Sequence, residues 1–141
     1  MVFKRTARDL MTPTVITAKE DMLVTDVIKL LLRWHISGLP VVDDEGRLLG
    51  IITEHDIMNF ALSGYAADTK ASEVMTKKVD TYGPDTLAVE IINHFAATRA
   101  RRVPVVENKK VVGIISRRDI VRYIDQLYGG LISREETEIE I

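Results

Sequence analysis

The sequence predicts an α/β (α+β) fold in which two copies of one unit, each strand-helix-strand-strand-helix, pack as a pseudo-twofold pair. Three observations predict it: the chain repeats itself once, each copy alternates short apolar runs with helical periodicity, and each copy carries one strand-to-helix motif. The motif reads GIITEHDI at residues 50–57 and GIISRRDI at residues 113–120. Both versions place a hydroxyl residue three positions before an aspartate, at the end of an apolar run.

The repeat is visible when the chain is shifted by 64 positions along itself. Met11-Thr12 then aligns with Met75-Thr76, and Pro40-Val41-Val42 aligns with Pro104-Val105-Val106. One residue is lost in the next turn, so the two motifs align at an offset of 63. We therefore expect a first repeat at residues 7–62, a linker at 63–70, a second repeat at 71–127 and an acidic C-terminal tail at 128–141.

Each copy shows the same order of elements. A one-turn helix is expected at residues 7–10, because Pro13 ends any helical run that follows. Asp21 and Asp85 are expected to cap the first long helix of each copy. Asn108-Lys109 separates two apolar strands, and Gly129-Gly130 is expected to end the last helix. The expected strands are residues 15–17, 39–42, 48–53, 79–81, 103–106 and 111–116, and the expected long helices are 23–34, 54–62, 87–95 and 117–127.

The length of 141 residues suggests one domain, and 46% hydrophobic residues are enough for a substantial core. Each copy has only about sixty residues, and a unit of that size buries roughly 60% of its unfolded surface. A single copy is therefore marginally stable. We expect an obligate pair, packed sheet against sheet around one shared core, with two equivalent clefts between the copies.

The composition disfavours several classes of function. Without cysteine, the chain cannot form disulfides, thiolate metal sites or a thiol nucleophile. The net charge of -2 argues against non-specific binding to nucleic acid, and no apolar run is long enough to span a membrane. His35, His55 and His94 lack metal-ligand spacing, and no phosphate-binding glycine loop or nucleophile motif is present. We therefore expect a cytoplasmic protein that is not an enzyme, with no catalytic residue, no metal site and no contact with a membrane.

The strand-to-helix motif has two interpretations. Thr53 with Asp56, and Ser116 with Asp119, have the spacing of a helix-capping box. The same hydroxyl and carboxylate, placed beside a helix N-terminus, also suit a polar or anionic ligand. The two interpretations are compatible, because a carboxylate that caps a helix keeps free lone pairs.

Two complete sets of these motifs, in order and at one spacing, resemble a tandem cystathionine-β-synthase (CBS) domain pair, also called a Bateman module. The resemblance covers about residues 7–127 and includes Leu39-Pro40-Val41-Val42-Asp43 with its echo Val103-Pro104-Val105-Val106-Glu107. It implies a flat module that forms homodimers and binds AMP, ADP, ATP or S-adenosylmethionine as a regulatory ligand, with no obligatory cofactor. Such modules sense energy or metabolite levels. We expect the output here to pass through a separate effector protein.

The resemblance also implies roles for single positions. Asp56 and Asp119 stand where the family binds ribose, and Arg101-Arg102 stands where basic residues bind phosphate. The alternatives are helix capping alone for the aspartates and a solvated basic face for the arginines. The expected nucleotide-binding residues are Ile16, Ser37, Gly38, Pro40, Thr53, Asp56, Arg101, Arg102, Pro104, Ser116, Arg118 and Asp119.

The two copies differ at positions that matter for a ligand. Ser37-Gly38 stands in the first copy where Arg101-Arg102 stands in the second. Ile16 suits an apolar contact with adenine, whereas its counterpart Asp80 does not. We therefore expect the cleft lined by Arg101-Arg102 to take the more phosphorylated ligand, and the other cleft to take a nucleoside-like group or to stay empty.

The leading functional hypothesis is a regulatory adenine-nucleotide-binding module that acts on a separate partner protein. The alternative is a ligand-independent dimerisation or adaptor module, whose partner binding would be indifferent to nucleotide. A third hypothesis, nucleic-acid binding through the arginines of the second copy, predicts a steep dependence on salt.

Overall fold

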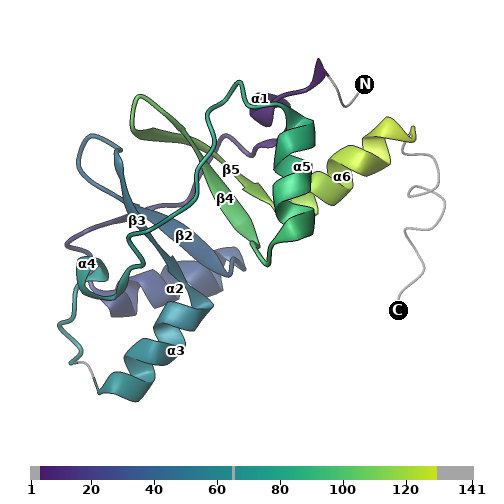
Figure 1. Cartoon of the computed structure of the whole chain (residues 1–141). Coiled ribbons are helices and arrows are strands. Elements are labelled where there is room, and N and C mark those ends of the chain that lie inside the picture. Colours follow the sequence, from purple (N-terminus) through teal and green to yellow (C-terminus); the bar gives the residue numbers. More distant parts are fainter. Residues whose placement is uncertain (1–3, 65, 130–141) are drawn as a thin grey trace, which may run out of the picture.

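The computed structural model describes residues 4–64 and 66–129, and its elements form two lobes (Figure 1). The first lobe contains β1 (Ala18–Lys19), β2 (Gly38–Val42) and β3 (Leu48–Thr53), in that order in one sheet, with α2 (Val24–Trp34), α3 (Glu54–Ser63) and α4 (Ala71–Val74). The second lobe contains β4 (Arg102–Glu107) and β5 (Lys110–Ser116), with α1 (Ala7–Leu10), α5 (Ala88–Ala97) and α6 (Arg117–Leu127). The tandem α+β architecture expected from the repeat is confirmed.

The two lobes contain equivalent antiparallel hairpins. Gly38 lies opposite Thr53 at the end of the first hairpin, and Arg102 lies opposite Ser116 at the end of the second. Both hairpins also carry a register shift at the matching place, next to Val41 and Val105. The expected strands from residue 39 to 53 and from residue 103 to 116 are confirmed. This register places the first residue of β2 and of β4 beside the hydroxyl residue of the motif.

The turns explain why the repeat offset changes from 64 to 63. In the second hairpin Asn108 and Lys109 both have positive φ, 53° and 69°, as a two-residue hairpin turn requires. The first hairpin has one residue more and contains Gly46 at φ 81°. Its Asp43 carboxylate accepts the backbone N–H groups of Glu45 and Arg47, each at 2.9 Å. The lost residue therefore lies in a surface turn and leaves the strand register unchanged.

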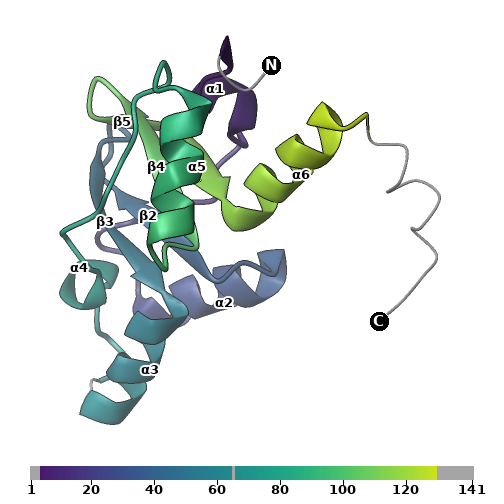
Figure 2. The ribbon, with the colours of Figure 1, turned by 45° about the vertical axis from the view of Figure 1, so that its right-hand side comes forward.

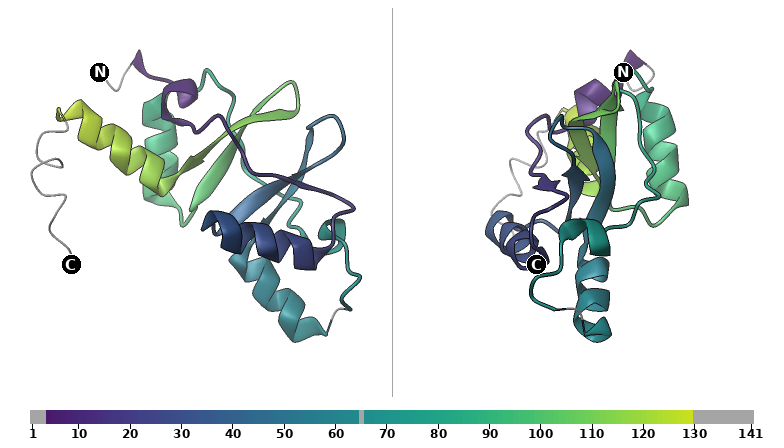
Figure 3. Two further views of the ribbon diagram at one scale, coloured as in Figure 1. Left: turned by 180° about the vertical axis from the view of Figure 1, so that it is seen from behind. Right: turned by 90° about the vertical axis from the view of Figure 1, so that its left-hand side faces the viewer.

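Each one-turn helix packs in the lobe of the other repeat. The Ala7 N–H donates to the Thr86 carbonyl at 2.8 Å, and α1 lies beside α5 in both Figure 1 and Figure 2. In the matching contact, the Ala71 N–H at the start of α4 donates to the Met22 carbonyl at 2.7 Å. Seen from behind in Figure 3, the segment that follows α1 crosses from the second lobe to the first. The repeats thus exchange their N-terminal segments.

This exchange replaces the single shared core that we expected, and that expectation is wrong. The buried apolar side chains of the described residues form two clusters, one in each lobe. Ala7 and Leu10 from the first repeat belong to the cluster of the second lobe, and Ala71 from the second repeat belongs to the cluster of the first. Each lobe is completed by apolar side chains from the other repeat, so the two repeats depend on one another.

The glycine of each motif makes room for a methionine from the exchanged segment. A Cβ atom on Gly50 would lie 2.9 Å from Met75 Sδ and 2.7 Å from the Thr76 carbonyl oxygen. A Cβ atom on Gly113 would lie 2.8 Å from Met11 Cγ. The Met-Thr pairs and the Gly-Ile-Ile runs repeat together because they pack on one another.

Four local expectations near the starts of the long helices are wrong. Residues 15–17 and 79–81 are not strands; β1 begins at Ala18, and its counterpart in the second copy is a single bridge between Tyr82 and Val105. Asp21 and Asp85 do not cap the long helices, which begin after Leu23 and Leu87 without a side-chain cap. The first N–H of each helix donates instead to a backbone carbonyl just before an exchanged one-turn helix, from Val24 to Thr69 before α4 and from Ala88 to Arg5 before α1.

Helices α2 and α6 each end shortly before a residue with positive φ. Helix α2 ends at Trp34, His35 follows in the left-handed conformation with φ 52°, and Gly38 begins β2. Gly129 follows α6 with φ 88°, as expected, whereas Gly130 and the tail at 130–141 lie outside the described residues. Within residues 4–64 and 66–129, none of the helices is both long and apolar enough to cross a bilayer.

Candidate functional site

The strand-to-helix motif forms the expected capping box in both lobes. Thr53 is the N-cap of α3, and its N–H donates to Asp56 Oδ2 at 2.8 Å. Ser116 is the N-cap of α6, and its N–H donates to Asp119 Oδ2 at 2.8 Å. The capping interpretation is confirmed, because these contacts satisfy backbone donors that a helix N-terminus leaves unpaired.

Each aspartate also binds a threonine from the other repeat. Thr76 Oγ1 donates to Asp56 Oδ1 at 2.9 Å, and Thr12 Oγ1 donates to Asp119 Oδ1 at 3.3 Å. Sequence reasoning did not assign these threonines to the site. The signal was present, because both belong to the repeated Met-Thr pair.

The two carboxylates differ in how much of their hydrogen-bonding capacity is used. Asp119 is 8% exposed and accepts a further hydrogen bond from Arg122 Nη1 at 3.0 Å. Its four acceptor contacts come from the Ser116 N–H and hydroxyl, the Thr12 hydroxyl and Arg122. A carboxylate offers about four lone-pair sites. A sugar diol at Asp119 must therefore replace one of these partners.

The larger cleft between the repeats, cleft A, has a volume of about 650 Å³. It brings together the segment before β1, the end of α2, the start of β4 and the junction between β5 and α6. Eight of the predicted site residues line it: Ile16, Ser37, Gly38, Arg101, Arg102, Ser116, Arg118 and Asp119. Residues that the sequence did not single out for this cleft are Thr12, Thr14, Val15, His35, Ile36, Ile114 and Arg117.

A second cleft, cleft B, has a volume of about 490 Å³ and is lined by the counterparts of many of these residues. Lys78-Val79-Asp80 takes the place that Thr14-Val15-Ile16 has in cleft A. The predicted site residues in cleft B are Ser37, Thr53, Arg101 and Arg102. Its further lining residues are Ile51, Glu54, His55, Met58, Lys78, Val79, Asp80, Arg99, Ala100 and Val103.

Three of the predicted site residues line neither cleft. Pro40 and Pro104 are fully buried in the middle of β2 and β4. Asp56 is half-buried, bonds to Thr53 and Thr76, and is not part of the lining of cleft B. The repeat therefore gives the two aspartates the same local bonds but not the same exposure to a cleft.

Arg101 and Arg102 line both clefts, which corrects the expectation that they belong to only one. The Arg102 guanidinium lies against Gly38, where a Cβ atom would come within 2.7 Å of Nη1. Burial, and then the neighbouring charge of Arg101, lower the pKa of Arg102 below its ordinary value, while Glu54 opposes the shift. Within the described parts of the chain this guanidinium makes no hydrogen bond or ion pair. A desolvated cation of this kind favours an anionic ligand.

Arg117 and Arg118 have different surroundings although they are neighbours. Arg117 Nε donates to the Ala100 carbonyl at 2.7 Å, and its Nη2 donates to the Thr98 carbonyl at 2.9 Å. Arg117 thereby fixes the loop that leads into Arg101. Arg118 is exposed and lines cleft A, where its charge faces the space open to a ligand.

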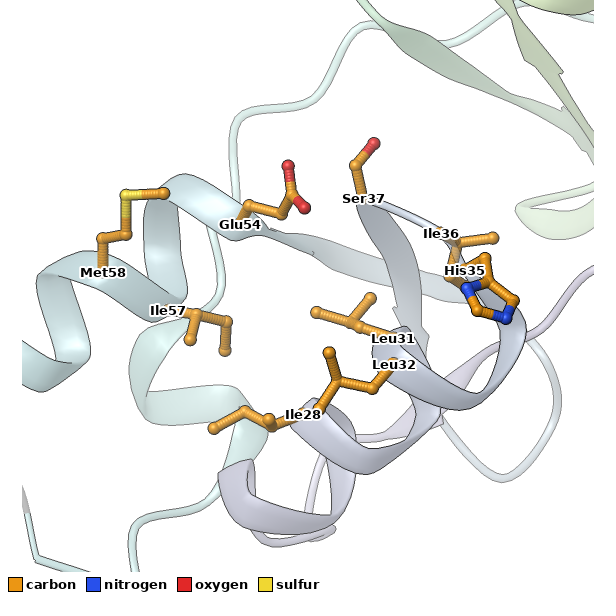
Figure 4. A pocket seen from close by; sticks show the side chains of 9 residues that line it. All are labelled: Ile28, Leu31, Leu32, His35, Ile36, Ser37, Glu54, Ile57 and Met58. Carbon is orange, nitrogen blue, oxygen red and sulfur yellow. The ribbon is translucent and has the colours of Figure 1, made fainter.

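A third hollow of about 520 Å³, the α2–α3 groove, lies between these two helices of the first lobe. Figure 4 shows apolar side chains of both helices along the groove, with Ser37 and Glu54 at one end. Its residues are Ile28, Leu31, Leu32, His35, Ile36, Ser37, Glu54, Ile57 and Met58. No pattern in the sequence predicts this groove.

No cluster of three or more His, Cys, Asp or Glu side chains within residues 4–64 and 66–129 is arranged to hold a metal ion. The charged groups of clefts A and B are instead mostly guanidinium groups. Such groups suit phosphate oxygens, to which they donate paired hydrogen bonds.

Comparison with known proteins identifies the family to which the chain belongs. The chain is 37% identical over 109 residues to the inosine-5'-monophosphate dehydrogenase of Methanocaldococcus jannaschii. The matched region covers 77% of this chain but 21% of that protein. The chain thus spans about a fifth of that relative's length.

Two solved structures share the fold over nearly their whole length. The crystal structure of CBSX2 in complex with AMP has a TM-score of 0.79 at 27% identity and covers 88% of this chain and 98% of that chain. The CBS domain pair of protein MJ0100, in complex with 5'-methylthioadenosine and S-adenosyl-L-methionine, has a TM-score of 0.74 at 31% identity and covers 89% and 96%. The CBS domain model matches residues 7–63 and again 71–126, so the chain belongs to the CBS domain family and is a tandem CBS pair.

Proposed function

We propose that the chain is a regulatory module that binds an adenosine-containing ligand between its repeats and acts on a separate effector protein. The observation that carries this proposal is cleft A, in which Arg101, Arg102 and Arg118 face the same space as Asp119. Its volume of about 650 Å³ lies within the usual range for small-molecule sites. The complexes of CBSX2 with AMP and of MJ0100 with S-adenosyl-L-methionine support an adenosyl ligand.

The lining of cleft A divides into the three chemistries that a nucleotide needs. Val15 and Ile16 offer an apolar surface for the base, and Asp119 with Thr12 offers a carboxylate and a hydroxyl for the ribose. Arginine side chains supply the donors for phosphate. AMP, ADP, ATP and S-adenosylmethionine all contain the base and the ribose, so the group on the ribose 5' carbon, phosphate or sulfonium, decides among them.

Cleft A is the better of the two sites for a phosphorylated ligand. Both clefts share Arg101 and Arg102, so these arginines alone do not separate the two clefts. Cleft B adds the carboxylates of Glu54 and Asp80, which repel phosphate. We therefore assign the more phosphorylated ligand to cleft A, and a nucleoside-like group or no ligand to cleft B.

Thermal denaturation with AMP, ADP, ATP and S-adenosylmethionine tests this function. A ligand at a hundred times its dissociation constant stabilises the native state by about 2.7 kcal/mol. For a chain of this size the midpoint should rise by roughly 5 to 11 °C. A chain whose midpoint moves with none of these compounds would contradict the proposal.

A homodimer is the second part of the proposal. Leu32, Trp34, Met58 and Leu62 are large apolar side chains on α2 and α3 that are 53% to 86% exposed. Together with the α2–α3 groove of Figure 4 they form an apolar surface, and such surfaces mark contact with another protein. A second copy of the chain presents the same surface, as a twofold interface requires.

A ligand-independent dimerisation or adaptor module is the second candidate function. It is favoured by Asp119, whose acceptor contacts are all supplied by the chain itself. This candidate predicts that an effector captured by the chain stays bound at the same level with and without nucleotide. An effector that AMP or ATP releases or recruits would reject it.

A further inference from the structure

We propose that clefts A and B compete for one pair of arginines, so that a phosphorylated ligand in cleft A weakens the binding of a second one in cleft B. The proposal rests on the proposed function and adds a rule for how the two clefts are filled. It follows from which repeat supplies the cations and from where their guanidinium groups lie.

The sharing has a structural cause in the first repeat. Ser37-Gly38 stands there in place of a second arginine pair, and Ser37 itself lines both clefts beside Arg101 and Arg102. Because Gly38 has no side chain, the Arg102 guanidinium can lie against its backbone. The Arg102 Cζ atom is 3.3 Å from the position that a Cβ atom on Gly38 would take. One repeat therefore supplies the cations at the boundary between the two clefts.

The two shared arginines are not equally available. Arg101 Nη1 lies 3.7 Å from Glu54 Oε1, a carboxylate on the cleft B side. Arg102 is half-buried and, among the described residues, makes no ion pair. A guanidinium fork binds one phosphate with two parallel hydrogen bonds and cannot present that fork to two phosphates at once. The first phosphorylated ligand to bind should therefore take Arg102 from the second.

The remaining charges decide which cleft fills first. Cleft A adds Arg118, and its one carboxylate, Asp119, already accepts a hydrogen bond from Arg122. Cleft B adds Lys78 and Arg99, which are exposed as Arg118 is, but it also adds the carboxylates of Glu54 and Asp80, which repel phosphate. The first phosphorylated ligand enters cleft A.

The dependence on ligand charge separates competition from a simple difference between two sites. Adenosine has no phosphate and makes no demand on Arg102, so its binding to one cleft should be independent of the other. AMP in one cleft should change the affinity for AMP in the other, and by linkage the effect is reciprocal.

A pair of matched variants measures this coupling. Val15 lines cleft A only and Val79 lines cleft B only; both are half-buried and outside strands, 64 positions apart. Val15→Trp should block cleft A, and Val79→Trp should block cleft B. Isothermal titration of each variant and of the unaltered chain with AMP and with adenosine gives the affinity of each cleft alone and together.

Blocking cleft A should strengthen AMP binding in cleft B. The Val15→Trp chain should bind AMP about fivefold or more tightly than the second AMP of the unaltered chain, while adenosine affinity in cleft B changes by less than about twofold. When Arg102→Gln is added, the Val15→Trp block should no longer change the affinity of cleft B for AMP. Arg99→Gln, at a residue that lines cleft B only, is the control and should preserve the gain.

Several results would overturn the competition. Equal AMP affinity in cleft B with and without the block would do so, as would an equal gain for adenosine. If neither compound binds any variant, the proposed function fails instead, and the two failures are thereby distinguished. Should Val15→Trp not fold, native mass spectrometry of the unaltered chain decides: the two stepwise constants must lie further apart for AMP than for adenosine, and equal separation rejects competition.

Discussion

Asp56 and Asp119 each join the local fold of one repeat to a contact with the other repeat. Each carboxylate caps a helix of its own repeat and accepts a hydrogen bond from a threonine of the other. A loss of ligand binding after substitution would therefore mix two effects. The effect on stability has to be measured first, and the structure predicts that it differs between the two residues.

Asp119→Ala should destabilise the protein more than Asp56→Ala. The first change removes a buried helix cap and also the acceptor of the exposed Thr12 and Arg122 side chains, at a total cost of about 2 kcal/mol. Asp56 is less buried, and the position matching Arg122 is Asn59, so its loss should cost about 1 kcal/mol. Urea denaturation measures both values. Equal losses would show that the Arg122 contact adds nothing.

Gly113→Ala should destabilise the second lobe because its methyl group overlaps Met11. Overpacking of this kind costs about 1 to 3 kcal/mol. Gly83→Ala is the control, because the nearest heavy atom to its Cβ is 3.9 Å away, and it should change stability by less than about 0.5 kcal/mol.

The companion substitution Met11→Ala should recover part of the loss caused by Gly113→Ala, since it removes the overlapping side chain. A double-mutant cycle from the four urea curves gives the coupling between the two positions. Simple additivity of the two losses would contradict the packing of Met11 on Gly113.

At the scale of elements, the unusual feature is that the one-turn helices α1 and α4 each pack in the lobe of the other repeat. The backbone carbonyls of Thr69 and Arg5, which lie just before α4 and α1, accept the first N–H groups of α2 and α5, which carry no side-chain cap. A helix that begins on another segment's carbonyl depends on that segment for its N-terminus. Damage to α1 should therefore appear in the second lobe, and damage to α4 in the first.

Ala7→Asp and Ala71→Asp test this exchange as a matched pair. Both alanines are fully buried, so an unpaired carboxylate there should cost about 3 kcal/mol. Hydrogen exchange should then accelerate mainly in α5 and α6 for Ala7→Asp, and mainly in α2 and β2 for Ala71→Asp. Faster exchange confined to the repeat that carries the substitution would rule out the exchanged arrangement.

On the scale of the whole molecule, two lobes joined by exchanged segments leave the apolar faces of α2 and α3 without a partner in the described chain. The same arrangement encloses clefts A and B between the lobes. A second copy on these faces would join four lobes, so that a ligand held between two lobes could alter how two chains pack. Ligand binding can shift that packing only by its difference in affinity for the two arrangements.

Leu62→Glu and Leu32→Glu should convert the proposed homodimer to a monomer. Their side chains are 86% and 70% exposed in the single chain, so the charge costs nothing there but is desolvated in an interface. Sedimentation velocity gives the mass of each variant. Ala67→Glu, at an exposed linker position, is the control and should remain dimeric. A monomer from the unaltered chain at all concentrations would end the proposal of a homodimer.

Part of the site could be predicted because it depends on residues close in sequence. The capping boxes at Thr53 and Ser116 and the hairpin register follow from local spacing, and the structure confirms both. The position of Pro40 and Pro104 could not be read in this way. Both share a motif with cleft residues, but strand pairing turns them into the interior.

The sequence by itself determined that there are two repeats, that each has one hairpin, and that each motif begins a helix, because local spacing and internal repetition follow directly from the order of residues. Only the tertiary structure decided that α1 and α4 each pack in the lobe of the other repeat, and that α2 and α5 donate their first N–H groups to carbonyls just before α4 and α1. It also decided that Arg101 and Arg102 line both clefts. These features depend on how segments about 45 to 85 residues apart cross in space, and no pattern within one repeat contains that information.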